Sequence, residues 1–86
     1  MLKKFDLAGI TWSVGEGEIA DLGHTDMTTA RILLNKKLDG QNKDVTFYHE
    51  LVHAILFTMG EQTHDERFVE GFAQLLYQYA KQLQRR

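Results

Sequence analysis

The chain has 86 residues, of which 43% are hydrophobic and 26% are charged, values typical of a single soluble globular domain. Its formal net charge of -2 argues against a nucleic-acid binder that relies on a broad basic surface. It contains no cysteine, and we find no apolar run long enough for a membrane helix or a signal peptide. We therefore expect one cytoplasmic domain over residues 1–86, with neither nucleic acid nor membrane as a partner, and a metal as the natural means of stabilising so small a core.

Short β-type runs separated by glycine-containing turns make up the N-terminal half. Residues 10–14 alternate apolar and polar side chains and are rich in β-formers, which predicts a strand. Residues 18–22 predict a second short strand, between turn signals at 15–17 and 23–26. Residues 30–35 predict a third strand, so we expect a small antiparallel sheet of about three strands.

The first predicted helix covers residues 43–59. Asn42 is a suitable N-cap, and Gly60 stands where a helix often ends in a left-handed residue. We expect the buried side of this helix to be formed by Val45, Val52, Ile55, Leu56 and Met59.

A second, amphipathic helix is predicted over residues 64–84. Thr63 and Glu66 have the spacing of a capping box, in which Thr63 caps the helix and Glu66 reaches back to the backbone. Apolar side chains recur at three- and four-residue spacings, and we expect them to belong to the core: Phe68, Val69, Phe72, Leu75, Leu76, Tyr79 and Leu83. The order of elements predicts an α+β fold in which two long antiparallel helices follow the sheet.

The string His-Glu-Leu-Val-His at residues 49–53 lies inside the first predicted helix and has the pattern of a zinc site. His49 and His53 are one turn apart on one helix face, so two imidazole nitrogens can converge on one zinc ion. Glu50 lies about 100° round the helix from His49, beside the metal. Its carboxylate can accept a proton from a zinc-bound water, whose pKa the metal lowers. The motif therefore predicts His49 and His53 as Zn²⁺ ligands and Glu50 as the general base.

A catalytic zinc site needs a third protein ligand, with water in the fourth position. Glu66 is already engaged by the predicted capping box, whereas Glu70 has no structural role and precedes Gly71. A glycine there lets two helices approach closely. The spacing favours Glu70 over Glu66 as the third ligand and leaves Glu66 open. The other candidates are expected in solvent-facing turns: His64, Asp65 and His24.

The motif at 49–53, followed by Glu70-Gly71-Phe72-Ala73, resembles the gluzincin branch of the zincin metallopeptidases. More narrowly, it resembles compact ImmA/IrrE-like and phage-encoded zincin-like proteins. The resemblance covers the C-terminal half well and the N-terminal half in outline. It implies a zinc peptidase with His49, His53 and Glu70 as ligands and Glu50 as the base, serving a phage or mobile element. It also implies that residues 30–35 form the edge strand that holds an extended peptide substrate.

A hydrolase also needs a donor for the oxyanion that forms when a carbonyl is attacked. Tyr77 shares a helical face with Glu70, Tyr48 directly precedes the first ligand, and His64 can reach the site if its loop folds inward. All three residues stay open as candidates for the oxyanion donor.

The substrate of such a peptidase would be a peptide or a protein segment. Two other functions stay open. In one, zinc is structural and pins two helices of a non-catalytic binding or regulatory module. Structural sites are normally closed by four ligands and often use cysteine, which favours the open, catalytic type of site here. In the other, the motif is incidental and the chain is an interaction domain without a metal.

Overall fold

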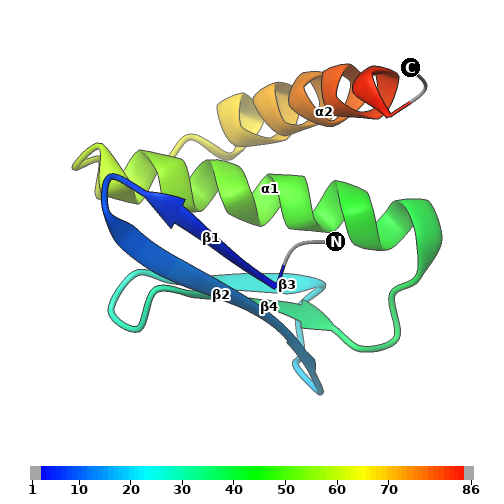
Figure 1. The fold of residues 1–86 in the computed structure, drawn as a ribbon, viewed down its shortest axis with the longest axis horizontal. Helices are drawn as coiled ribbons and strands as arrows, with labels where there is room; N and C mark the ends of the chain where they lie inside the picture. The colour runs from blue at the N-terminus through cyan, green and yellow to red at the C-terminus, as the bar shows by residue number, and fades with distance from the viewer. Residues whose placement is uncertain (1–2, 85–86) are drawn as a thin grey trace.

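The computed structural model describes residues 3–84 and has four strands followed by two helices (Figure 1). The elements are β1 (Lys4–Leu7), β2 (Ile10–Gly17), β3 (Gly23–Asp26), β4 (Arg31–Asn35), α1 (Gly40–Thr58) and α2 (Glu66–Leu83). The predicted α+β class and the order of sheet before helices are confirmed. In residues 3–84, neither helix combines the length and the apolar character that crossing a bilayer requires.

The sheet has four strands in the order β1-β2-β4-β3 and is mixed rather than antiparallel. β1 and β3 run antiparallel to their neighbours, whereas β2 and β4 are parallel. The strand that the sequence analysis missed, β1, forms a hairpin with β2. Its two-residue turn places Ala8 and Gly9 at positive φ, 50° and 82°, as a tight turn between twisted strands requires.

Two strand predictions are corrected by this topology. Residues 18–22 connect β2 to β3 and form no strand, while residues 23–26, predicted as a turn, form β3. Residues 30–35 were expected to include an edge strand, but β4 pairs with β2 on one side and β3 on the other. Ile32 and Leu34 of β4 are fully buried, as the residues of an interior strand should be. The edge strand on this side of the sheet is β3.

Helix α1 lies between the sheet and α2, which gives the molecule three layers (Figure 1). One core cluster joins the sheet to α1 and contains Trp12, Ile32, Leu34 and Ala54, with Phe47 packed against it. A second cluster joins α1 to α2 and contains Val52, Val69 and Ala73. Because α1 is covered on two faces, its apolar residues do not form one stripe. Met59, expected in the core, is 71% exposed.

Helix α2 forms the outermost layer, and its main packing partner is α1. Val69 and Ala73 are buried in that contact and Leu76 packs beside them. The other apolar positions of α2 that the sequence analysis assigned to the core are exposed: Phe68, Phe72, Leu75, Tyr79 and Leu83. That prediction is wrong because only one layer covers α2, and one layer can bury only one of its faces.

Candidate metal centre

His49 and His53 lie one turn apart on α1, as the four-residue spacing predicts. Their ring centroids are 5.1 Å apart, and their side chains are 23% and 15% exposed. Both line a cavity of about 710 Å³ that β3, α1 and the segment leading into α2 enclose. The two imidazoles are therefore half-buried but accessible from the cavity.

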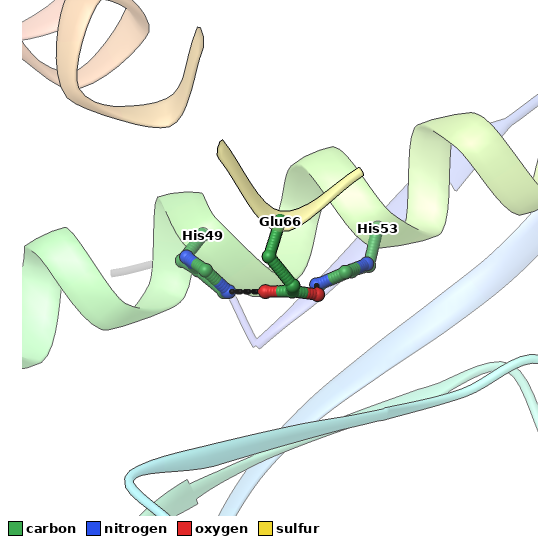
Figure 2. A group of neighbouring side chains, drawn as sticks. All are labelled: His49, His53 and Glu66. Atoms are coloured by element: carbon green, nitrogen blue, oxygen red, sulfur yellow. Dashed lines mark ion pairs between the residues drawn. The ribbon is translucent and has the colours of Figure 1, made fainter. Parts of the chain in front are cut away.

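Glu66 reaches these histidines from the first position of α2. The helix is capped by Asp65, whose carboxylate accepts a hydrogen bond from the backbone N–H of Arg67 at 2.9 Å. The predicted capping box with Thr63 as N-cap is therefore wrong, and Glu66 is free to face α1. Its carboxylate lies between the two rings, 3.5 Å from Nε2 of His49 and 3.2 Å from Nε2 of His53 (Figure 2).

These three residues form a group that could hold a metal ion. Each offers one ligand atom, and the three atoms lie within 4.8 Å of one another. Two of them come from α1 and one from α2, so an ion held there would link the two helices. Three protein ligands would leave one position of a four-coordinate ion for water, and all three residues line the cavity.

Glu70 contacts the other side of His49. Its Oε2 lies 3.0 Å from Nδ1 of His49, and its Oε1 accepts a hydrogen bond from Gln74 at 3.0 Å. The bond from Gln74 and the His49 ring lower the pKa of the Glu70 carboxyl below its usual value. An ionised carboxylate only accepts, so Nδ1 of His49 donates and, in the neutral ring, Nε2 carries the lone pair. The prediction that Glu70 itself ligates the metal stays a prediction, and the structure offers Glu66 in that place.

His64 contacts Nδ1 of His53, just as Glu70 contacts Nδ1 of His49. Nε2 of His64 lies 2.7 Å from the backbone carbonyl oxygen of Glu61, and Nδ1 of His64 lies 2.6 Å from Nδ1 of His53. A carbonyl oxygen can only accept, so a neutral His64 donates from Nε2 and accepts at Nδ1. His53 then donates from Nδ1, and its Nε2 lone pair faces Glu66. Burial lowers the pKa of His53, although the nearby carboxylates of Glu66 and Glu50 act in the opposite direction.

The site brings hydrogen-bond acceptors of His49, His53 and Glu66 together. With both histidines neutral, two Nε2 lone pairs face the two oxygens of Glu66 with no proton between them. Such groups repel one another unless a proton or a metal ion lies between them. Outer hydrogen bonds that fix the ring tautomer in this way are characteristic of metal-binding histidines. The arrangement could therefore hold a metal ion.

Glu50 is the one charged residue among the described residues that is buried, with 8% of its surface exposed. Its Oε1 accepts a hydrogen bond from the Thr25 hydroxyl at 2.7 Å, and the same hydroxyl lies 3.0 Å from the Glu50 backbone carbonyl oxygen. A Cβ on Gly23 would lie 2.9 Å from Cγ of Glu50 and from Cγ2 of Thr46. Strand β3 thus approaches α1 closely and holds the Glu50 side chain against the cavity.

Sequence reasoning missed these contributions from β3. The available signal was that Gly23 and Thr25, two residues apart, share a face if the segment is a strand. His24, expected in an exposed turn, is exposed but lies in β3 at the cavity rim.

Of the three candidates for oxyanion donor, His64 lines the metal-site cavity. Tyr48 and Tyr77 pack against each other, with ring centroids 5.7 Å apart. They line a second cavity of about 760 Å³ between the start of α1 and the end of α2. The structure therefore brings His64 to the site and leaves both tyrosines elsewhere.

Comparison of the chain with family models, curated proteins and solved structures finds no match. The resemblance to zincins thus remains a prediction from the residues at 49–53 and 70–73. The functional interpretation depends on the geometry described above.

Proposed function

We propose that the protein is a zinc-dependent hydrolase of peptide bonds. His49, His53 and Glu66 hold the ion in this proposal, and Glu50 is the general base. The observation that carries the proposal is the convergence of three ligand atoms beside a buried carboxylate, at the wall of an open cavity. The likeness of residues 49–53 to the zincin motif supports the same reaction.

The donor set suits zinc. Two imidazoles and one carboxylate are a common catalytic zinc set, and bonds of 2.0–2.1 Å in a tetrahedron place ligand atoms about 3.3 Å apart. The nitrogen–oxygen contacts of 3.2 and 3.5 Å involve different oxygens of Glu66, and one ligand atom from each residue lies within 4.8 Å of the other two. Cysteine, the usual ligand of closed structural sites, does not occur in the chain. When bound, zinc supplies a Lewis acid that activates water and polarises a carbonyl group.

Glu50 supplies the proton transfer in this proposal. The Thr25 hydroxyl engages Oε1 and fixes the carboxylate, which leaves Oε2 to take a proton. Glu70 and His64 keep the ring protons of His49 and His53 on Nδ1, away from the ligand position. His64 also lines the cavity, but its one N–H is engaged by the backbone carbonyl oxygen of Glu61, so the oxyanion donor is left open.

The proposed substrate is an extended peptide or a partly unfolded protein segment. β3 is the terminal strand of the sheet and also lines the cavity. A peptide can pair with its outer edge through backbone hydrogen bonds, with preference set by neighbouring side chains. The absence of cysteine suits a reducing compartment, so we place the activity in the cytoplasm.

Glu50→Gln tests the hydrolase directly, since it preserves shape while removing the base. We expect the variant to bind zinc like the unmodified chain and to cleave a fluorogenic peptide library at least about 100-fold more slowly. Zinc content by elemental analysis and cleavage rates by fluorescence give the two readouts. Equal cleavage by both proteins would exclude Glu50 as the base.

The position of α2 favours a second function, that of a non-catalytic module stabilised by zinc. Its packing is chiefly against α1, and the metal group joins the first position of α2 to two residues of α1. Zinc would then stabilise a binding or regulatory module without turnover. This alternative predicts that folding depends on zinc and that neither the unmodified chain nor Glu50→Gln cleaves the peptides. It also predicts that Glu50→Gln binds the same partners as the unmodified chain.

A further inference from the structure

Helix α2 carries an exposed apolar stripe that the metal centre does not use. The outer stripe consists of Phe68, Phe72, Leu75, Tyr79 and Leu83, which are 52%, 48%, 70%, 60% and 47% exposed. At about 100° per residue these positions form one narrow face, roughly 90° from the face buried against α1. Glu66 and Glu70 lie on the far side of the helix from the stripe. A partner on the stripe would therefore leave the metal centre open.

The residues around the stripe do not resemble a solvated helix face. The segment 71–80 of α2 contains no charged side chain, although a helix face exposed to water usually carries charges. Charged residues are depleted at the centre of protein interfaces, where aromatic residues are enriched. Gly71 lowers helix stability relative to alanine at the same interior position. No described atom lies within 4 Å of where its Cβ would be, so packing within the chain does not require a glycine there.

The spacing of the stripe suits a second copy of the chain as its partner. The intervals between its members are four, three, four and four residues, so the pattern is nearly the same when the helix is reversed. In an antiparallel pair of α2 helices with the two-fold axis beside Leu75, Phe68 of one copy faces Leu83 of the other. Phe72 then faces Tyr79 in the same way. A pattern that matches its own reverse is what an isologous interface requires.

We propose that the protein forms a two-fold homodimer in which the outer stripes of two α2 helices pack antiparallel. The three aromatic side chains and two leucines offer on the order of 500 Å² of exposed surface per copy. Each partner of a standard interface contributes about 800 Å², so the stripe supplies most of the area that a dimer needs.

Analytical ultracentrifugation of the full chain, from low micromolar to hundreds of micromolar, tests the proposal. We expect a species of twice the chain mass, with and without zinc. Leu75→Glu should weaken dimerisation at least about tenfold, because it brings two like charges beside the axis in an apolar contact. Met59→Glu is the matched control, since Met59 is 71% exposed and lies outside the stripe. Circular dichroism verifies that both variants fold.

Cross-linking gives a second readout, because the chain contains no cysteine of its own. A short bismaleimide should join two copies of the Leu75→Cys variant in high yield and should leave Met59→Cys largely monomeric. A monomer across the whole concentration range would overturn the proposal. So would a dimer that Leu75→Glu does not weaken, or equal cross-linking at both positions.

Discussion

The hydroxyl of Thr25 holds the carboxylate of Glu50, with 2.7 Å between Oγ1 and Oε1. Thr25 belongs to β3 and Glu50 to α1, so this bond joins the edge of the sheet to the helix that carries His49 and His53. The same hydroxyl lies 3.0 Å from the backbone carbonyl oxygen of Glu50. In the proposed hydrolase, the edge strand that receives the substrate therefore also orients the general base.

Thr25→Val tests this positioning role, since it removes the hydroxyl and keeps the side-chain shape. It leaves Oε1 of a buried carboxylate without its donor, which should lower the free energy of unfolding by about 1–3 kcal/mol. We expect peptide cleavage to fall about tenfold or more, a shifted pH profile of kcat and unchanged zinc content. Thr25→Ser should restore both cleavage and the profile. A profile unaffected by valine would show that Thr25 does not orient the base.

Gly23→Ala should destabilise the contact between β3 and α1. The added Cβ would lie 2.9 Å from Cγ of Glu50 and from Cγ2 of Thr46, so one of the two elements must shift. Overpacking of this kind costs about 1–3 kcal/mol, measurable by urea unfolding. Gly17→Ala in β2 is the matched control, because no atom lies within 4 Å of its Cβ position. Equal stability of the two variants would contradict the close approach.

Glu66→Ala and Glu70→Ala together identify the third ligand. Loss of a hydrogen-bonding partner outside the metal's own ligands typically lowers metal affinity about 10- to 100-fold, and this is the effect we expect for Glu70→Ala. Glu66→Ala removes a direct ligand and should lower zinc affinity further. Competition with a chromophoric chelator measures both affinities. The reverse order would assign Glu70 as the ligand and Glu66 as its support.

The metal-free protein should lose stability as the pH falls below about 6.5, the ordinary pKa of histidine. Burial lowers the pKa of His53 in the folded state, so the unfolded chain takes up its proton first and unfolding becomes easier. The pKa of Glu70 is also lowered in the folded state. Its contribution to stability is therefore lost as the pH falls below the usual pKa of a glutamate, at more acidic pH than that of His53. Urea unfolding in the presence of chelator measures the dependence. His53→Asn should flatten the part of the dependence that begins just below the ordinary pKa of histidine, and a slope unchanged by that variant would exclude His53 as its source.

Local sequence patterns predicted the two helices and the common helix face of His49 and His53. Both features depend on residues that are close in the chain. The four-residue spacing of His49 and His53 determines their common face wherever the helix lies. The choice between Glu66 and Glu70 as the third candidate ligand depended on where the second helix begins. A cap at Thr63 would engage Glu66, whereas the observed cap at Asp65 releases it toward α1. Both residues are good N-caps, so tertiary context selects between them.

The role of β3 and the exposure of α2 could not be predicted locally. Gly23-His24-Thr25-Asp26 has the composition of a turn and becomes a strand only because β4 pairs with it. Amphipathic periodicity located the apolar positions of α2 but could not show how many layers would cover them. Those features are set by which elements meet in three dimensions.

Zinc titration of the chelator-treated protein at neutral pH tests the central claim most directly, with His53→Ala and Glu50→Gln measured beside it. We predict about one zinc bound per unmodified chain, the same amount for Glu50→Gln, and severely weakened binding for His53→Ala. Failure of the unmodified chain to bind zinc, or equal binding by His53→Ala, would contradict the proposed metal centre and with it the proposed hydrolase.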